Sequence, residues 1–334
     1  MISKTIFKCI DAHTGGNPVR VVTSPAPILK GNSMIEKRSY FLKNYDWIRK
    51  GLMFEPRGHD MMSGSLYYEA IDKNNDVGII FIETSGCLPM CGHGLIGTVT
   101  VLIEEKLIQP KVLGELRVET PAGLIKVKYK VSNSKVTKVK YYNVPSFLSV
   151  SALKIDSPDL GNLSIDVAYG GNFYAIIDIQ DNFHGIENHT ASQLIKFSRT
   201  IRKLINSTCK LEHPKISKIK GCSHILWIGK VLNKKSSSRN AVFYGDKAID
   251  RSPCGTGTSA RMAQLFSKRK LIVGDEFVNE SIIGSIFVGR IENTLDLGAY
   301  KAITPSIQGS ANIIGHNSII IDPEDEFVNG FQVI

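Results

Sequence analysis

The hydrophobic positions of this chain fall into short runs typical of β-strands and longer runs typical of helices, a mixture that predicts an α/β fold. A continuous apolar run at residues 77–83 is typical of a buried strand. Other runs in the first half predict strands at residues 5–10, 19–23, 115–119 and 124–130. In the second half, strands are expected at residues 173–179, 225–229 and 241–245.

Helical segments are marked by apolar residues that recur with the period of a helix. One helix is predicted to begin at Asn32, as its cap, and to continue to residue 52, and an amphipathic helix is predicted over residues 191–204. A third, which ends near Lys106, carries a wide apolar stripe, and this predicts deep burial. A fourth helix is expected to begin just after Cys254.

The two halves of the chain resemble each other at two loop-to-helix junctions, each of which contains a cysteine. Pro89-Met-Cys-Gly-His-Gly matches Ser252-Pro-Cys-Gly-Thr-Gly in register, and the two cysteines, Cys91 and Cys254, lie about half a chain length apart. This likeness predicts two similar domains, each presenting one cysteine at the start of its central helix.

Composition and charge exclude several classes of function. The hydrophobic share of 43% and the charged share of 22% are those of a globular protein that can form a sizeable core. The net charge is +10, but Lys and Arg are spread along the whole chain, so nucleic acid is not an expected partner. No segment approaches the roughly 20 apolar residues that span a bilayer, and the N-terminus lacks a signal-peptide core. A cytoplasmic location without a membrane partner is therefore expected.

The six cysteines are expected to stay reduced in that compartment. Their spacing completes no zinc-binding motif, so no metal is expected. An isolated cysteine is more often a small buried hydrophobic residue than a catalyst. This interpretation applies to Cys9, Cys87, Cys209 and Cys222.

Cys91 and Cys254 have a different context, because each is followed by glycines at a predicted helix start. The helix dipole and the free N–H groups there are expected to lower the pKa of a thiol and to attract an anion such as a carboxylate. Two such turns predict a carboxylate held with one sulfur on each side of its α-carbon. One thiolate would remove the α-proton and the opposite thiol would protonate the other face, which inverts the carbon.

The two cysteine segments resemble the two signatures of the proline racemase family, which includes proline racemases, 4-hydroxyproline 2-epimerases and trans-3-hydroxyproline dehydratases. Met-Cys-Gly-His-Gly at residues 90–94 carries the first signature, and Asp-Arg-Ser-Pro-Cys-Gly-Thr-Gly-Thr-Ser-Ala at residues 250–260 carries the second. The resemblance covers nearly the whole chain. It includes Asp11-Ala-His-Thr-Gly-Gly-Asn-Pro-Val-Arg, Glu55-Pro-Arg-Gly-His-Asp, Tyr169-Gly-Gly-Asn-Phe-Tyr, Gly284-Ser-Ile-Phe-Val-Gly and Thr304-Pro-Ser-Ile-Gln-Gly.

This resemblance implies a fold like that of diaminopimelate epimerase, with two pseudo-symmetric α/β domains, each a mixed β-sheet curled around a central helix. The expected first domain covers residues 1–160 with about 318–334, and the second covers residues 161–317. The active site is implied to lie between the domains and to use neither pyridoxal phosphate nor a metal. A homodimer is the expected assembly, because homodimers are common among soluble proteins.

The family roles transfer to the residues that match. Cys91 and Cys254 are implied to be the acid/base pair, and Asp250 is implied to bind the substrate ammonium. The groups implied to hold the substrate carboxylate, largely through backbone N–H, belong to Gly92, His93, Gly255 and Thr256.

The substrate is narrowed by residues around these motifs. Dehydratases of the family usually replace one or both cysteines, so a chain that keeps both is expected to invert an imino acid. Ser63 stands where proline racemases tend to carry phenylalanine, and His224 resembles a polar pocket residue of the epimerases. Both favour 4-hydroxyproline, whose hydroxyl they would bind. Asn17 departs from the Gly-Glu-Pro that epimerases often have, Leu95 stands where a small polar residue is frequent, and Tyr244 stands where proline racemases tend to have phenylalanine.

Other interpretations stay open at this point. Proline racemase is the alternative within the family. A cysteine hydrolase would use Cys91 as its nucleophile and leave the second motif unexplained, and an imino-acid-binding protein would bind without α-proton exchange. Among the single residues, Ser63, His93, His224 and Asp250 each have a purely structural interpretation.

Overall fold

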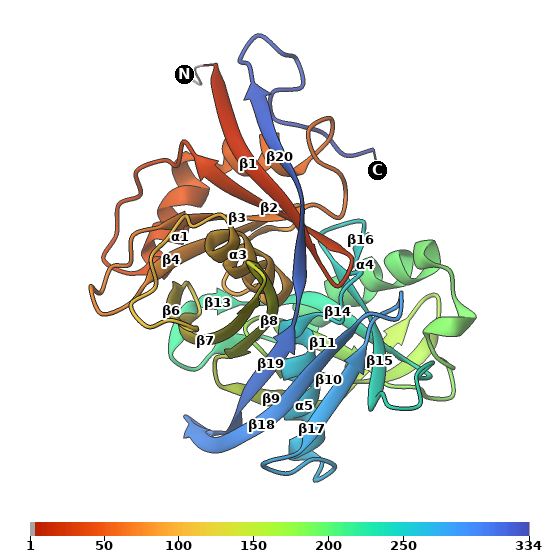
Figure 1. The fold of residues 1–334 in the computed structure, drawn as a ribbon. Coiled ribbons are helices and arrows are strands. Elements are labelled where there is room, and N and C mark those ends of the chain that lie inside the picture. The colour runs from red at the N-terminus through yellow and green to blue at the C-terminus, as the bar shows by residue number, and fades with distance from the viewer. Residues whose placement is uncertain (1–3, 334) are drawn as a thin grey trace. The chain divides into compact units, whose positions relative to one another are not determined.

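The computed structural model describes residues 4–333. It is a mixed α/β protein whose chain divides into two compact units, one of residues 1–140 with 310–334 and one of residues 141–309. Figure 1 shows strands from both ends of the chain in the first unit, where β1 near the N-terminus lies beside β20 near the C-terminus.

The first unit is built on a sheet with the strand order β20-β1-β2-β3-β4-β6-β7. The short strand β5 adds to β4, and β8 runs to the boundary of the unit. The strands are β1 (Thr5–Thr14), β2 (Asn17–Ser24), β3 (Ser63–Tyr68), β4 (Val77–Glu83), β5 (Gly86–Leu88), β6 (Glu115–Thr120), β7 (Gly123–Ser132), β8 (Lys135–Tyr142) and β20 (Ala311–Ile321). The predicted strand at residues 77–83 is confirmed, and every residue of β4 is buried.

Helix α3 (Gly92–Glu104) is the central helix of this unit, and it packs against β1, β2, β3 and β20. Every residue from Gly92 to Leu102 is buried, which confirms the deep burial predicted from its apolar stripe. Because the sheet covers the helix, the N-terminus of α3 is held in the interior of the unit.

The single helix predicted from Asn32 to residue 52 is wrong in two respects. The chain forms α1 (Met34–Asn44) and α2 (Asp46–Met53), separated at Tyr45. Ser33 is the N-cap, and its hydroxyl accepts a hydrogen bond from the Glu36 N–H. The Asn32 N–H instead donates to the Glu36 carboxylate at 2.8 Å, so the Ser-x-x-Glu pattern determines the start of the helix.

The second unit is a closed sheet. The pairings run β9-β10-β11-β14-β15-β17-β18-β19, and β19 pairs again with β9. Closure removes the free edges that an open sheet would expose. The strands of the ring are β9 (Ser146–Ser157), β10 (Gly161–Tyr169), β11 (Phe173–Ile177), β14 (Cys222–Gly229), β15 (Ser238–Tyr244), β17 (Glu276–Glu280), β18 (Ile286–Leu297) and β19 (Tyr300–Gly309). Outside the ring are β16 (Ala248–Ile249), which pairs with β15, and the hairpin of β12 (Glu212–His213) and β13 (Ile216–Lys220).

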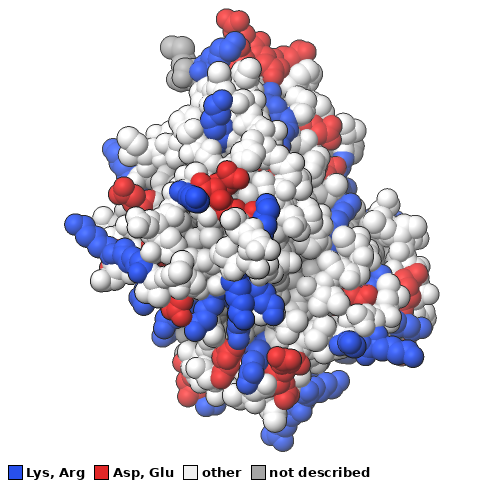
Figure 2. Space-filling model, viewed as in Figure 1, with Lys and Arg blue, Asp and Glu red and all other residues white. Residues whose placement is uncertain are grey.

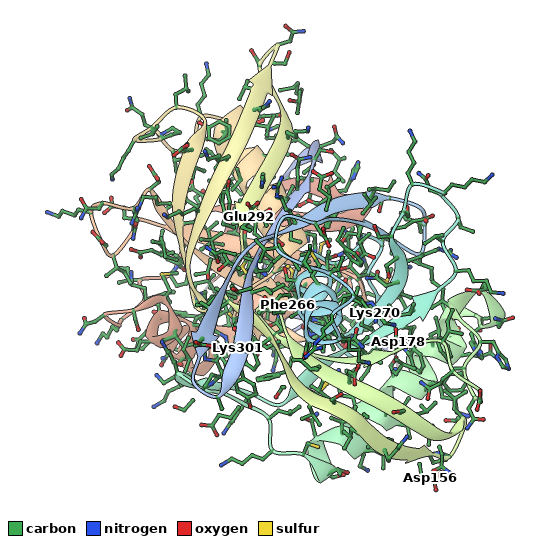
Figure 3. All side chains as sticks on the ribbon, turned by 90° about the horizontal axis from the view of Figure 1, so that it is seen from below. Asp156, Asp178, Phe266, Lys270, Glu292 and Lys301 are labelled. Carbon is green, nitrogen blue, oxygen red and sulfur yellow. The ribbon has the colours of Figure 1, made fainter. Side chains whose placement is uncertain are left out.

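Helix α5 (Gly255–Ser267) is the central helix of the second unit and contacts β9, β10, β11, β18 and β19. Figure 3 labels Phe266 near the end of α5, Glu292 on β18 and Lys301 on β19. The longer helix α4 (Ala191–Thr208), preceded by the short 3₁₀ helix η1 (Ile186–Asn188), packs on β9, β14 and β15. The predicted α/β fold, with each sheet around a central helix, is confirmed.

The chain passes between the two units after residues 140 and 309, whereas boundaries at about 160 and 318 were expected. The β9–β10 hairpin belongs to the closed sheet of the second unit, because β9 pairs with both β10 and β19. The chain re-enters the first unit at β20, whose whole length from Ala311 to Ile321 pairs with β1.

On the face shown in Figure 2, Lys and Arg form several separate groups with Asp and Glu among them. Among residues 4–333, no helix is both long enough and apolar enough to span a bilayer.

Candidate active site

Each unit places a buried cysteine at the N-cap of its central helix. Cys91 precedes α3 with an extended backbone, at φ −135° and ψ 109°, and Cys254 precedes α5 with φ 61° and ψ 98°. A helix leaves the N–H groups of its first turn without carbonyl partners inside the helix. Gly92 and Gly255, the first residues of the two helices, therefore lie where a carboxylate-binding N–H group was predicted.

A glycine three residues after each cysteine makes room for the sulfur. A Cβ at Gly94 would lie 2.8 Å from the Cys91 sulfur, and a Cβ at Gly257 would lie 3.0 Å from the Cys254 sulfur. The first distance is shorter than real Cβ contacts and the second is as tight as they come, so glycine at these positions gives each thiol room over the first turn of its helix.

The Cys91 thiol is surrounded by a carboxylate, an imidazole and a hydroxyl. It donates to the Glu83 Oε1 atom at 3.3 Å and lies 3.6 Å from the His93 Nδ1 atom. The Ser63 hydroxyl lies 3.9 Å from the sulfur and donates to the same Glu83 oxygen at 3.2 Å. The structure thus brings together the predicted Ser63, Cys91 and His93, and adds Glu83 at the end of β4.

The first turn of α3 is tied to the hairpin of β1 and β2. The Thr14 hydroxyl donates to the His93 carbonyl at 2.9 Å, and the Asn17 Nδ2 atom lies 3.0 Å from His93 Nε2. All three side chains are buried. The hairpin therefore holds the imidazole beside the Cys91 sulfur, which lies 3.6 Å from Nδ1 and 3.9 Å from Nε2.

The Cys254 thiol has hydroxyl groups as its neighbours. The Tyr174 hydroxyl lies 3.3 Å from the sulfur and 2.5 Å from the Thr256 hydroxyl, which is itself 4.0 Å from the sulfur.

The expected lowering of the thiol pKa is wrong for Cys254. Burial raises the pKa of Cys254 far above its usual range and the charge of Asp250 adds to this, while hydrogen bonds from Tyr174, the Gly257 N–H and Thr256 act in the opposite direction.

Asp250 lies on the loop that leads into α5. It is buried, and its carboxylate accepts a hydrogen bond from the Ser252 N–H at 2.7 Å. The Ser252 hydroxyl in turn accepts from the Cys254 N–H at 3.1 Å. Asp250 is thus coupled to the Cys254 turn, and its carboxylate is the anionic group of this loop.

His224 lies on β14 close to the same turn. Its ring is centred 4.7 Å from the ring of Tyr174, and its Nδ1 atom lies 2.7 Å from the Ser223 hydroxyl. The ring of Tyr244 is stacked at a longer distance of 6.5 Å. His224 therefore packs against Tyr174, whose hydroxyl lies beside the Cys254 sulfur.

Two neighbours of the thiols were missed by the sequence analysis. Glu83 is a charged residue that ends a wholly apolar run, and this interruption was a usable signal. Tyr174 is the last residue of the Tyr-Gly-Gly-Asn-Phe-Tyr segment, which carried the family resemblance without a role for that residue. Its contact with Cys254 depends on the pairing of β11 with β14 and is not visible in the sequence.

The other cysteines divide by burial. Cys9, Cys87 and Cys222 are buried, and desolvation raises the pKa of each thiol to about 12. Cys209, at the end of α4, is partly exposed. The interpretation as buried core residues fits three of the four.

One group of three metal-donor side chains occurs among the described residues. It consists of Glu83, Cys91 and His93, all buried, with their donor atoms within 4.8 Å of one another. No such group includes Cys254 among residues 4–333.

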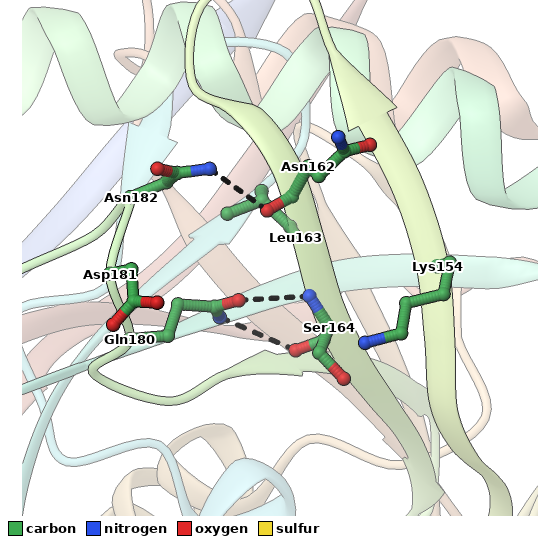
Figure 4. A pocket seen from close by; sticks show the side chains of 7 residues that line it. All are labelled: Lys154, Asn162, Leu163, Ser164, Gln180, Asp181 and Asn182. Atoms are coloured by element: carbon green, nitrogen blue, oxygen red, sulfur yellow. Dashed lines mark hydrogen bonds between the residues drawn. The ribbon is translucent and has the colours of Figure 1, made fainter.

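A separate pocket lies on the second unit beside β10, with a volume of about 420 Å³ (Figure 4). Its amide side chains are engaged with backbone groups, since Asn182 donates to the Asn162 carbonyl and Gln180 accepts from the Ser164 N–H. Its lining contains neither cysteine. The pocket therefore offers no proton-transfer chemistry of the kind found at the two helix starts.

The chain is similar to known proteins over nearly its whole length. A family model described as proline racemase matches residues 9–332. The chain is 60% identical over 329 residues to a 4-hydroxyproline 2-epimerase of Spirosoma linguale, covering 98% of both chains. It is similar to a solved structure of a probable proline racemase from Agrobacterium radiobacter with bound carbonate, with a TM-score of 0.90, 30% identity and coverage of 98% and 96%. A hydroxyproline epimerase from Agrobacterium vitis, solved with bound trans-4-hydroxy-L-proline, gives the same TM-score and coverage at 26% identity.

Proposed function

This chain belongs to the proline racemase family, and we propose that it is a 4-hydroxyproline 2-epimerase that interconverts trans-4-hydroxy-L-proline and cis-4-hydroxy-D-proline. The observation that carries the proposal is the paired arrangement of Cys91 and Cys254, each at the N-cap of a buried central helix with a glycine beneath its sulfur. A single reactive thiol would account for one of these turns and leave the other without a role.

The two thiols perform the two proton transfers. One cysteine, as thiolate, removes the α-proton from one face of the substrate, and the other, as thiol, donates a proton to the opposite face. Afterwards the two have exchanged protonation states, so the enzyme is ready for the other epimer. Both cysteines are needed, because a single acid/base group returns the proton to the face from which it came.

The helix starts stabilise the charge that develops on the substrate. As the α-proton leaves, negative charge spreads into the carboxylate, where fixed N–H donors are most effective. The backbone groups assigned to this are those of Gly92, His93, Gly255 and Thr256. Asp250 is assigned to the substrate ammonium, and its burial beside the Cys254 turn supports this assignment.

The substrate assignment is supported by the relatives and by two pocket residues. The Spirosoma linguale relative is named a 4-hydroxyproline 2-epimerase, and the Agrobacterium vitis structure holds trans-4-hydroxy-L-proline. Ser63 lies beside Cys91, and His224 lies beside Tyr174, itself a neighbour of Cys254. We assign these two residues to the 4-hydroxyl, and the hydrogen bonds that they make to it and cannot make to proline favour 4-hydroxyproline by about 1–3 kcal/mol per group.

Proton NMR in D₂O tests the proposal directly. Purified protein with trans-4-hydroxy-L-proline should lose the α-proton signal while signals of cis-4-hydroxy-D-proline grow, and a matched L-proline sample should react more slowly. Ser63→Ala and His224→Ala should lower the preference for 4-hydroxyproline by about 5- to 150-fold. Exchange with L-proline alone would make the protein a proline racemase, and exchange with neither substrate would overturn the proposal.

A further inference from the structure

We propose that Glu83, Cys91 and His93 form a binding site for a thiophilic divalent cation, with Zn²⁺ as the best fit, and that the bound ion inhibits the enzyme. The binding claim stands on the geometry of the first unit alone. The inhibition claim rests on the proposed function, because it requires Cys91 to carry a proton in the reaction.

The distances between the donor atoms match a zinc coordination shell. Zinc lies about 2.3 Å from sulfur and about 2.0–2.2 Å from nitrogen or oxygen, so tetrahedral donors lie roughly 3.6 Å apart. The Cys91 sulfur is 3.3 Å from Glu83 Oε1 and 3.6 Å from His93 Nδ1, and all three donors lie within 4.8 Å of one another. Both distances to the sulfur fit such a shell, so an ion can replace the thiol proton as the carboxylate and imidazole donors close around it.

The donor set selects the class of cation. A thiolate, an imidazole and a carboxylate favour zinc and similar transition metals, whereas Mg²⁺ and Ca²⁺ prefer oxygen ligands. Three protein ligands also leave the fourth tetrahedral position for water or a substrate carboxylate. Glu83, Cys91 and His93 are only 2–4% exposed, so the ion would lose most of its hydration shell and exchange it for these donors.

Neighbouring residues already orient the donors as supporting groups do in zinc sites. The Ser85 hydroxyl donates to Glu83 Oε2 at 2.9 Å, which leaves Oε1 directed at the sulfur. Asn17 lies 3.0 Å from His93 Nε2, and the other ring nitrogen, Nδ1, is the nearer of the two to the Cys91 sulfur, at 3.6 Å against 3.9 Å. Rotation of the Asn17 amide would present its oxygen to an Nε2–H group and leave Nδ1 as the metal ligand.

The side chains beside Cys254 are poorer zinc ligands than those beside Cys91. Cys254 has the phenol of Tyr174 and the hydroxyl of Thr256 as neighbours, which are weak ligands for zinc while they stay protonated. Cobalt and zinc should therefore bind at Cys91 and leave Cys254 unligated. Binding displaces the proton of Cys91 and occupies its sulfur lone pair, so this residue can neither accept nor donate a proton.

Cobalt spectroscopy tests the binding claim without any assay of activity. The reduced full-length protein, titrated with Co²⁺, should develop a near-ultraviolet thiolate-to-cobalt charge-transfer band that saturates at one ion per chain, and Zn²⁺ should remove it. Cys91→Ser should abolish the band, and Glu83→Gln should weaken Co²⁺ binding at least about 10-fold. Cys254→Ser and Cys209→Ser, which remove the other candidate thiol and the most exposed one, should keep the band.

The binding claim and the proposed function are overturned by different outcomes. The binding claim is overturned if no band forms, if the band survives in Cys91→Ser, or if Glu83→Gln binds Co²⁺ as tightly as the parent protein. Circular dichroism of each variant separates loss of a ligand from loss of folding. Zn²⁺ should also stop turnover of 4-hydroxyproline and EDTA should restore it. A cobalt band without any epimerase activity would refute the proposed function and would still support the metal site.

Discussion

The two cysteine turns occupy the same place at the start of a central helix and differ in the charged groups around the sulfur. Cys91 and Cys254 both cap a buried central helix, and Gly94 and Gly257 make room for their thiols at corresponding positions. The neighbours of Cys91 are titratable groups, Glu83 and His93. Those of Cys254 are the hydroxyls of Tyr174 and Thr256, with the charge of Asp250 acting on it from the same loop.

The backbone differs as well. Cys91 has an extended conformation, whereas Cys254 has a positive φ of 61°, which a residue with a side chain adopts at a cost of about 1–3 kcal/mol. Asn240 and Asn279 stabilise the strained turn, because both donate to the Pro253 carbonyl, at 3.2 and 3.1 Å. A helix start therefore does not by itself determine the state of a thiol. Burial and the side chains packed around the sulfur contribute as well, and the side chains differ between the two units.

The largest expected effect comes from removing either thiol. Cys91→Ser and Cys254→Ser should each reduce inversion by about 10²–10⁴-fold, because serine is a far weaker acid and base at this position. The rate is measured by polarimetry or by NMR in D₂O. Any α-deuterium exchange that survives should be confined to one epimer in each variant, and to opposite epimers in the two. Substantial inversion by either single variant would show that the turns are not both needed.

An intermediate effect is expected from the glycines beneath the sulfurs. Gly94→Ala and Gly257→Ala should each reduce kcat by about 10- to 100-fold, because a Cβ at 2.8 or 3.0 Å displaces the thiol from its position. Gly315→Ala is the matched control, since the nearest atom to its added Cβ is a side-chain nitrogen at 3.9 Å. Steady-state kinetics and thermal unfolding of the three variants give the comparison. Equal rates in all three would mean that the thiols do not depend on these glycines.

The smallest effect distinguishes the surroundings of the two thiols. The Tyr174 hydrogen bond lowers the pKa of Cys254, so Tyr174→Phe raises that pKa further and leaves less thiolate at any given pH. Since iodoacetamide reacts with the thiolate, alkylation of Cys254 should slow about 10-fold at neutral pH, and the rate should rise with pH in the variant and the parent alike. Peptide mass spectrometry follows both cysteines in one sample, and Cys91 serves as the control. An unchanged rate at Cys254 would exclude a role for Tyr174 in the ionisation of this thiol.

The features that could be predicted from the sequence are those that depend on neighbours along the chain. The apolar run of β4 and the glycines after Cys91 and Cys254 indicated a buried strand and two helix starts, and the structure has all of them. The error at Asn32 was also local, because Ser33 and Glu36 form the cap one residue later. Local patterns determine the helix and strand types, and they leave the ends of elements uncertain by a few residues.

Only the tertiary structure decided which groups touch each sulfur and how that changes its chemistry. Tyr174 reaches Cys254 from 80 positions away, and Asn17 reaches His93 from 76 positions away, through packing of strands against the central helices that no local pattern specifies. Burial of Cys254 then raised the pKa that its helix start was expected to lower. The sequence by itself determined the family and the two cysteines at helix starts, because contiguous residues specify both. The ionisation of a thiol depends on desolvation and on charges within a few ångströms, and these are set only when the distant strands assemble around it.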